Sequence, residues 1–463
     1  MLDLKNIESY KENNRIEAKT ALGGLPESIW ETYSAFANTL GGYILLGVQE
    51  YRDKSFHTVD LPDPEGMADL FWKYVNDPAR VSVNILLREN IRIEKVNGCR
   101  IIVIYVPMAD RYHKPVYVDR NLPKGTYRRN GEGDYHCTEQ EIEAMLRDSR
   151  ASTADMTLIS GMKADALNMD SVLRFRNHAR LLHPDHIYNR LSDTEFLYST
   201  GALDQDAHNV LHPTAAGLLM FGHHQKIREI FPGYRLIYKD KNTEIDSETE
   251  KYCLSDFCYA LNQYLSALAF GSRSLMYACI TELLVNAIVN ADYYSDEGIL
   301  ISGGDHQFSF TNPGTFRIDL SRKPYESDPR NALIQKMFAL TDAATASGRG
   351  LVSVMQTLKK LGLPVPVFTH SYNPDRVTVT IETTGLSVSL PQPKHRRTTY
   401  VYEEYRNSIV SYLTMYRKAS SSDIADYLQL SVSYTRSILK KMAQQGILSA
   451  DGKHSGKVWQ LKS

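Results

Sequence analysis

Apolar residues near the C-terminal end of the chain recur at the spacing of an amphipathic helix over residues 433–445. Two shorter helices are expected before it, at residues 407–416 and 422–428, and a hairpin after it, at residues 450–461. The inward positions of the last helix are Val432, Thr435, Ile438, Leu439 and Met442. Three helices and a hairpin in this order predict a winged helix-turn-helix.

The outward face of the third helix carries the residue types that read DNA. A recognition helix lies in the major groove, where polar and basic side chains meet base edges. Residues 400–463 hold nine Lys and Arg against five Asp and Glu, whereas the whole chain has a net charge of −1, and phosphate contact requires such a local excess. The predicted DNA contacts are Ser433, Tyr434, Arg436, Ser437 and Lys440 in the helix and Lys453 and Lys457 in the hairpin. The alternative is a winged helix that contacts only proteins.

A second amphipathic pattern covers residues 26–40, near the start of the chain. Its inward residues are Ile29, Tyr33, Phe36, Ala37 and Leu40. Gly41 and Gly42 then break the helix, and residues 43–48 form an apolar run with the length of a buried strand. The pattern predicts a helix packed on a sheet.

The same region carries a more specific motif. Residues 34–48 read SAFANTLGGYILLGV, and Glu17-Ala18-Lys19 precedes them. Later segments read KPVY at residues 114–117 and GTYRRNG at residues 125–131. This combination closely resembles the Schlafen AlbA-like domain, also called the divergent AAA domain, over residues 1–150. The resemblance implies an α/β domain that binds nucleic acid, with contacts at Lys19, Arg128 and Arg129.

Some animal Schlafens use clustered carboxylates in this domain to cut RNA. The positions in this chain that the resemblance matches are Glu12, Glu17 and Glu50, with Lys19 beside them. Three carboxylates can hold a divalent metal for phosphodiester hydrolysis. Glu50 is poorly placed for this, because Gln49 directly follows Val48 at the end of the strand. The alternative is that Glu17 and Lys19 serve structure or phosphate contact.

A polar stripe runs along a helix predicted at residues 280–290. Glu282, Asn286 and Asn290 recur every four residues and therefore share one face. An acid and an amide one turn apart can activate a water and ligate Mg²⁺, although a solvated polar face is the common explanation of such a stripe. A glycine-rich turn at residues 346–351 opens a later helix, where main-chain amides and the helix dipole favour phosphate.

These features, in the order in which they occur, resemble the RecG-related C-terminal domain, a relative of GHKL-type ATPases. The segments that carry the resemblance are 213–222, 280–290, 311–314, 327–331 and 346–351. The resemblance implies that Glu282 is the general base, Asn286 the Mg²⁺ ligand, and Gly348 and Gly350 the phosphate loop. The family's adenine-binding Asp-x-Gly-x-Gly is missing, and Asn312 stands at its position, so we expect modest binding of ATP and little turnover. No GxxxxGK[ST] sequence occurs, so the chain is not expected to be a helicase.

Composition and the residues that interrupt regular structure divide the 463 residues of the chain into four blocks. We expect an α+β multidomain protein: an AlbA-like α/β domain at 1–150, a helical connector at 151–250, a GHKL-like α/β sandwich at 251–390 and the winged helix at 400–463. The segment 390–397 is the predicted linker, because two prolines and a basic run interrupt regular structure there. Five cysteines without CxxC pairing indicate reduced thiols, and no apolar run approaches a membrane span, so a cytoplasmic location without membrane contact is expected.

The sequence as a whole predicts a DNA-binding transcriptional regulator. Its partners would be DNA, a second copy of the chain in a homodimer, and a nucleotide with Mg²⁺ in the degenerate GHKL-like site. The alternative is an enzyme, either a metal-dependent ribonuclease of the Schlafen kind or a weak ATPase.

Overall fold

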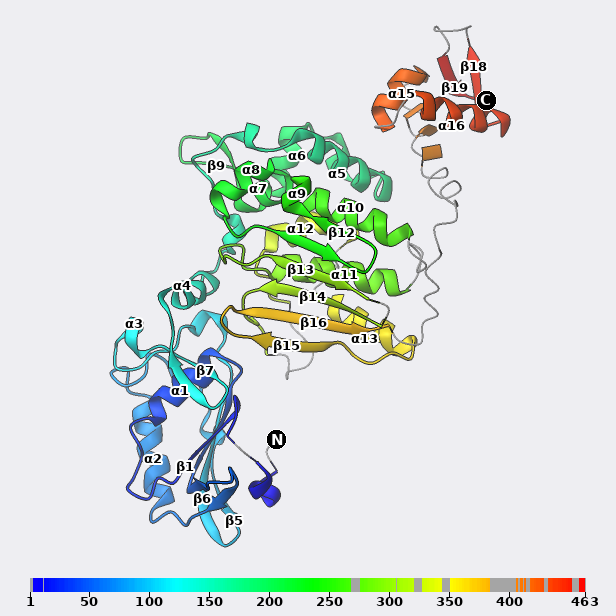
Figure 1. Cartoon of the computed structure of the whole chain (residues 1–463). Helices are drawn as coiled ribbons and strands as arrows, with labels where there is room; N and C mark the ends of the chain where they lie inside the picture. The colour runs from blue at the N-terminus through cyan, green and yellow to red at the C-terminus, as the bar shows by residue number, and fades with distance from the viewer. Residues whose placement is uncertain are drawn as a thin grey trace. The chain divides into compact units, whose positions relative to one another are not determined.

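The computed structural model describes residues 3–10, 12–267, 275–304, 306–319, 327–343, 350–383, 405–406, 409–410, 412–413, 417–428, 432–451 and 458–462. The chain forms two compact units (Figure 1): unit 1 is Met1–Val388 and unit 2 is Ser389–Ser463. The predicted linker at 390–397 lies outside the described residues. Among the described residues, no helix combines the length and the apolar character needed to cross a bilayer.

Unit 1 begins with a four-stranded sheet in the order β1-β2-β6-β5. Its strands are β1 (Ile16–Lys19), β2 (Gly42–Leu46), β6 (Cys99–Val106) and β5 (Ile91–Val96). β1 pairs with β2 in parallel, and the other pairs are antiparallel. Helices α1 (Ile29–Asn38) and α2 (Pro64–Val75) pack on the sheet and share one hydrophobic cluster with it. A smaller cluster includes Ile7, Val48 and Phe56.

The predicted helix at 26–40 is confirmed as α1, with Tyr33 and Phe36 fully buried. Leu40 lies beyond the helix end and is only half-buried. Gly41 has a φ of +73°, and a Cβ there would lie 2.7 Å from the main-chain atoms of Met108 and Val106, so the break requires glycine. The predicted strand at 43–48 is shorter than expected, because the chain turns at Gly47, whose φ is +85°.

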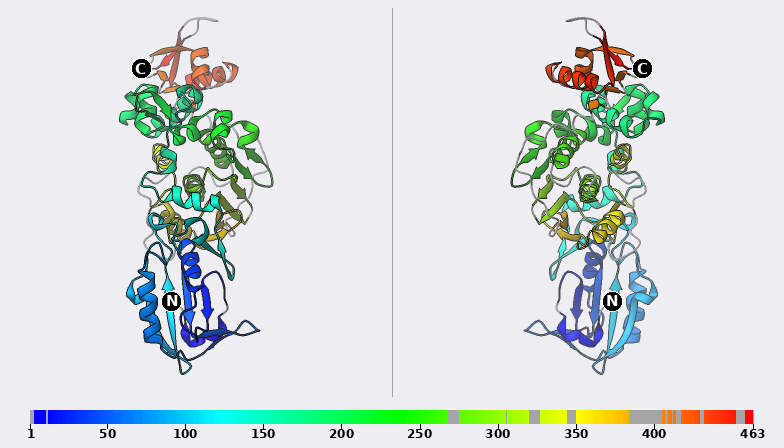
Figure 2. Two further views of the ribbon diagram at one scale, coloured as in Figure 1. Left: turned by 90° about the vertical axis from the view of Figure 1, so that its left-hand side faces the viewer. Right: turned by 90° about the vertical axis from the view of Figure 1, so that its right-hand side faces the viewer.

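Smaller elements complete the N-terminal part. They are the strands β3 (Val48–Glu50), β4 (Phe56–Thr58), β7 (Tyr127–Asn130) and β8 (Gly133–His136), the helices α3 (Leu122–Gly125) and α4 (Glu139–Asp148), and three 3-10 turns at Leu4–Ser9, Arg88–Asn90 and Arg111–His113. The β7–β8 hairpin contacts α1 (Figure 1), and Figure 2 shows the same N-terminal part, drawn in blue and cyan, from two further sides.

The second part of unit 1 contains a six-stranded sheet in the order β12-β11-β13-β14-β16-β15. Its strands are β12 (Glu244–Asp246), β11 (Leu236–Lys239), β13 (Ile299–Gly303), β14 (Gln307–Pro313), β16 (Arg376–Glu382) and β15 (Val367–Ser371). β11 and β13 are parallel, and the other neighbours are antiparallel. Side chains alternate along β14 and β16, where Phe308, Phe310, Val379 and Ile381 point into the core.

Helices make up most of the rest of this part of unit 1. They are α5 (Met169–Leu182), α6 (Asp193–Thr200), α7 (Ala215–Phe221), α8 (His224–Ile230), α9 (Ser247–Glu250), α10 (Leu254–Ala267), α11 (Leu275–Asn290), α12 (Ala332–Ala339) and α13 (Gly350–Lys360). The hairpin of β9 (Leu203–Gln205) and β10 (Leu211–Pro213) joins α6 to α7. Three 3-10 turns at Ala154–Met156, Ala164–Ala166 and Ile187–Arg190 complete the segment.

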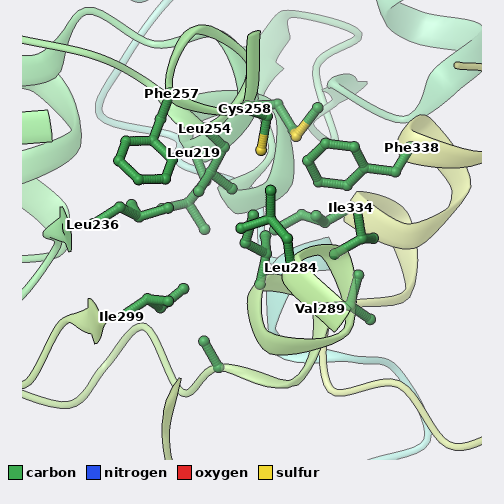
Figure 3. Packing of buried hydrophobic residues seen from close by; sticks show 14 of the residues in the cluster. Leu219, Leu236, Leu254, Phe257, Cys258, Leu284, Val289, Ile299, Ile334 and Phe338 are labelled. Atoms are coloured by element: carbon green, nitrogen blue, oxygen red, sulfur yellow. The ribbon is translucent and has the colours of Figure 1, made fainter. Parts of the chain in front are cut away.

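One hydrophobic core joins the predicted connector to the sheet (Figure 3). Leu219 of α7, Phe257 of α10, Leu284 of α11, Ile299 of β13 and Phe338 of α12 belong to the same buried cluster. This corrects the boundary predicted at residue 251, because β11 and β12 already belong to the sheet and α7 is buried against the same core. The connector and the sheet form one folded body.

Unit 2 is a small α/β body. Its elements are β17 (Lys418–Ser420), α15 (Ser421–Leu428), α16 (Val432–Gln444), β18 (Leu448–Asp451) and β19 (Val458–Leu461). The antiparallel sheet has the order β17-β19-β18. A capping box begins α15, since Ser420 Oγ accepts from the Asp423 main-chain N at 3.2 Å and an Asp423 carboxylate oxygen accepts from the Ser420 main-chain N at 2.9 Å. Part of the helix predicted at 407–416 lies outside the described residues.

Candidate functional site

The predicted nucleotide residues meet where α11 packs against α13. Glu282 and Asn286 lie on α11, and α13 begins at Gly350. A Cβ built on Gly350 would lie 1.6 Å from Glu282 Oε1, so only glycine permits this approach of the carboxylate. The structure therefore brings Glu282 and Gly350 together at the N-terminal end of a helix, where the helix dipole stabilises negative charge.

The far end of α11 is joined to β14. Asn290 Nδ2 donates to the main-chain O of Asn286 at 2.9 Å. Asn312 is buried, and its Nδ2 donates to the main-chain O of Pro313 at 3.1 Å and of Asn290 at 3.4 Å. The amide nitrogen of Asn312 donates to main-chain oxygens, and the acceptor that Asn312 could offer an adenine amino group is Oδ1. Gly348 lies outside the described residues.

A buried ion pair supports the same end of α11. Arg330 donates through Nη1 to the main-chain O of Asn290 and through Nη2 to the main-chain O of Thr315 at 3.1 Å. Its Nε and Nη2 also donate to the two carboxylate oxygens of Asp148, at 3.0 Å and 2.8 Å. Asp148 is the last residue of α4, so the pair connects the N-terminal part of unit 1 to the candidate nucleotide site.

Each group of this pair stabilises the charged form of the other. Burial acts to raise the pKa of Asp148, but Arg330 and Arg317 outweigh burial, and the pKa of the carboxyl is lowered. Burial likewise acts against the charged form of Arg330, but Asp148 outweighs it, and the pKa of the guanidinium is raised. Both groups are therefore charged at neutral pH. The sequence motif at 327–331 contained Arg330 but gave no sign of its partner.

Arg129 is buried, which corrects its prediction as a nucleic-acid contact. Its side chain is 1% exposed, and Nη1 lies 2.9 Å from both Glu17 Oε2 and Asp134 Oδ1. The guanidinium also donates to the main-chain O of Asn13 and Ile16. Such a network satisfies the guanidinium inside the fold and leaves it no access to phosphate.

Arg128 is also engaged inside unit 1 rather than on its surface. It donates to Asp375 Oδ1 at 2.6 Å and to Asp375 Oδ2 at 2.9 Å, and it pairs with Glu141. Its guanidinium lies over the ring of Tyr372, 4.6 Å from the centroid. The pair joins the β7–β8 hairpin to the turn between β15 and β16, so Arg128 holds two parts of unit 1 together and does not support the predicted DNA contact.

The three predicted nuclease carboxylates are close enough to interact. Burial raises the pKa of Glu12, and the charges of Glu17 and Glu50 raise it further. Glu17, however, is neutralised by Arg129 and by Lys19, whose Nζ lies 2.9 Å from Glu17 Oε1. Within the described part of the chain, no three His, Cys, Asp or Glu side chains are placed to hold a metal ion. The ion pairs of Glu17 with Arg129 and Lys19 agree with the structural alternative for Glu17 and Lys19.

Three segments of the chain match known protein families. Residues 12–138 match Schlafen, AlbA_2; residues 143–237 match a domain of unknown function (DUF8451); and residues 296–381 match "Putative ATP-dependent DNA helicase recG C-terminal". The chain contains a Schlafen AlbA_2 domain and a RecG C-terminal-like domain. Both resemblances predicted from sequence motifs are confirmed, although Glu282 and Asn286 precede the third matched segment.

Two solved structures are similar to this chain. A protein from Corynebacterium diphtheriae is 14% identical with a TM-score of 0.38, covering 97% of this chain and 95% of its own. The N-terminal domain of a RecG-related protein from Nitrosomonas europaea is 34% identical with a TM-score of 0.23, covering 29% of this chain and 90% of its own. No curated protein matches the chain.

Proposed function

We propose that this protein is a DNA-binding transcriptional regulator, in which unit 2 is a winged helix that reads DNA through α16. The exposed face of α16 carries the proposal. Arg436, Ser437 and Lys440 are exposed, whereas Ile438 and Leu439 are buried in the core of unit 2. Its exposed polar face is thus opposite a well-anchored apolar face, as a recognition helix requires.

The size and charge of α16 suit the major groove. Its 13 residues span about 20 Å at the rise of an α-helix, and the groove admits one helix. The helix contains Arg436, Lys440 and Lys441 but no Asp or Glu. Tyr434 is 42% exposed and lies at the N-terminal end, where recognition helices contact bases. The proposed wing residues Lys453 and Lys457 lie between β18 and β19, outside the described residues.

The two recognised domains support a role in nucleic-acid biology. An AlbA_2 domain together with a RecG C-terminal-like domain indicates a nucleic-acid-related or ATPase-like protein. We also propose that the chain acts in the cytoplasm and that it forms a homodimer. The homodimer is expected because helix-turn-helix regulators commonly pair to read two half-sites. Lys19, which is held by Glu17 and by Ser28 Oγ at 3.1 Å, is left out of the proposed DNA surface.

Arg436→Ala is expected to lower affinity for the specific DNA site by about 1–3 kcal/mol, because one base contact is lost. Affinity for random DNA should fall much less, since that affinity comes from phosphate contacts. Fluorescence anisotropy with the full chain, at fixed salt, measures both affinities. The matched control is Lys462→Ala, which removes one exposed charge from unit 2 without changing α16. Equal losses on specific and random DNA for Arg436→Ala would show that α16 does not read bases.

A second proposal concerns a nucleotide, and it is supported by the approach of Glu282 to Gly350. Residues Glu282, Asn286, Asn312 and Gly350 would hold ATP with Mg²⁺, with Asn286 as a metal ligand, Glu282 beside the phosphates and Asn312 at the base. A bound nucleotide would bias the arrangement of the domains and would thereby change how the two winged helices of a homodimer bind DNA. Asn312 lacks the charge that strengthens a hydrogen bond to adenine, so base selectivity should be poor.

We expect ATP to bind with high-micromolar to millimolar affinity, about −4 to −6 kcal/mol, with little hydrolysis. Gly350→Ala should weaken this binding, because the new Cβ displaces the Glu282 carboxylate. Calorimetry with ATP, GTP and ADP plus Mg²⁺ measures the affinities. Gly161→Ala is the control, because a Cβ there meets nothing within 4 Å. Tight binding with turnover lost in Glu282→Ala would instead identify an active ATPase, and binding unchanged in Gly350→Ala would place the nucleotide elsewhere.

A further inference from the structure

A small cavity lies between the AlbA_2 domain and the RecG C-terminal-like domain. The AlbA_2 side contributes the end of α1, Lys114 and Arg128, and the other side contributes Thr315, Phe316 and His370. The cavity volume is about 10 Å³, which is enough for one small occupant of about the size of a water molecule. Residues from two domains therefore line a space for a single small occupant.

His370 lines this cavity, and the two nitrogens of its ring could form hydrogen bonds with an occupant. Its side chain is 5% exposed, and neither Nδ1 nor Nε2 has a hydrogen-bond partner among the described residues. The nearest carboxylate oxygen, Asp375 Oδ1, is 3.9 Å from Nε2 and is held by Arg128. Buried polar groups in native proteins are nearly always hydrogen-bonded, so an unpartnered imidazole facing a cavity indicates an occupant.

Lys114 also lines this cavity, and its ammonium group has N–H donors that could bind an occupant. Its Nζ donates to the main-chain O of Asn38 at 3.0 Å, and within the described ranges it makes no ion pair. Burial lowers the pKa of Lys114 to about 8, which leaves the ammonium charged at pH 7. Asp148 and Asp110 raise the pKa of Lys114 without forming an ion pair with it in the described part of the chain. An anion in direct contact would therefore stabilise the ammonium further.

Charged groups from both domains surround the cavity and act on His370. Burial, together with the charges of Arg128, Lys114 and Arg330, lowers the pKa of His370 to about 3. The imidazole is therefore neutral at pH 7 and offers one N–H. Arg128 and Arg330 are themselves paired with Asp375 and Asp148, whereas Lys114 is not paired with a carboxylate in the part of the chain that the structure describes.

We propose that this cavity binds one chloride-sized monovalent anion, held by the Lys114 ammonium and the His370 imidazole. The Lys114 ammonium, which has N–H donors beyond its bond to the main-chain O of Asn38, favours an anion over water. A cavity of this volume suits a monatomic anion better than a larger oxyanion. By bridging Lys114 of the AlbA_2 domain and His370 of the RecG C-terminal-like domain, the anion stabilises the contact between the two domains. This inference is independent of the proposed DNA and nucleotide sites.

The test is the linewidth of the ³⁵Cl NMR signal with the full chain at pH 7, because chloride held in a protein relaxes much faster than free chloride. We expect broadening with the unaltered protein that is lost in Lys114→Met and in His370→Phe. Lys124→Met is the matched control, since Lys124 is an exposed lysine of the same domain, and it should broaden the signal as the unaltered protein does. Two variants on opposite sides of the cavity keep the test decisive if one of them folds poorly.

Thermal unfolding supplies a second readout. At constant ionic strength, replacing gluconate with chloride should raise the melting temperature by about 2 °C or more, as expected for a ligand that binds only the folded state. The rise should vanish in Lys114→Met. The proposal is overturned if broadening is absent, or persists in both variants, or if inorganic phosphate displaces chloride at equal concentration, because that would require a larger site.

Discussion

Asp148→Asn is expected to lower the free energy of unfolding of unit 1 by about 3–5 kcal/mol, since removing one partner leaves a buried charge uncompensated. The Arg330 side chain is 6% exposed and receives both of its carboxylate contacts from Asp148. Chemical denaturation followed by circular dichroism measures the loss. Because the pKa of Asp148 is lowered in the folded protein, the stabilisation is present at neutral pH. It is lost as the pH falls below the ordinary carboxyl pKa of about 4.

Two controls separate the ion pair from other effects of the substitution. Asp165→Asn changes an exposed aspartate and should alter stability by no more than about 0.5 kcal/mol. The double variant Asp148→Asn with Arg330→Met removes both charges and should recover part of the loss, because a buried pair can be replaced by apolar groups at little cost. Full stability in Asp148→Asn alone would contradict the role assigned to this pair.

Arg129→Met is expected to destabilise unit 1 by a similar amount, about 3–5 kcal/mol, because it leaves Glu17 and Asp134 without their shared cation. The three hydrogen bonds to main-chain oxygens of Asn13 and Ile16 are lost as well. Thermal unfolding of the full chain measures the effect. This result distinguishes a structural arginine from a nucleic-acid contact, since a surface contact could be removed without loss of stability.

Arg120→Met serves as the control for Arg129→Met. Arg120 is an exposed arginine of the same domain, so its replacement should leave the melting temperature within about 1–2 °C of the original. If Arg129→Met melted normally and bound DNA more weakly, Arg129 would be a DNA contact after all.

Local patterns in the sequence predicted the helices well. The periodicity of α1 and of α16 lies within one helix, so the buried positions Phe36 and Leu439 could be recognised without knowing their partners. The place of β11 and β12 in the six-stranded sheet could not be predicted. These strands have four and three residues, and β11 pairs with a strand about sixty residues later, too far along the chain for a local pattern to reveal.

The candidate site likewise contains some features that local sequence patterns reveal and others that only the fold reveals. Glu282 and Gly350 were found because a polar stripe and a glycine-rich turn are visible in the sequence, and the structure places them together. The pair of Arg330 and Asp148 was missed, since its members are 182 residues apart. Arg129, next to Arg128 in a polar strand, looked like an exposed basic group, and only the fold shows that carboxylates surround it.

In the proposed function, α16 directs this protein to particular DNA sequences. A genome-wide pull-down of DNA bound to the intact chain, compared with DNA bound to the Arg436→Ala chain at equal abundance, tests it most directly. We expect a discrete set of sites sharing a sequence motif, with occupancy reduced about fivefold or more by Arg436→Ala, as follows from one lost base contact. The same sites at the same occupancy in both samples would contradict it, as would a sample with no enriched sequence at all.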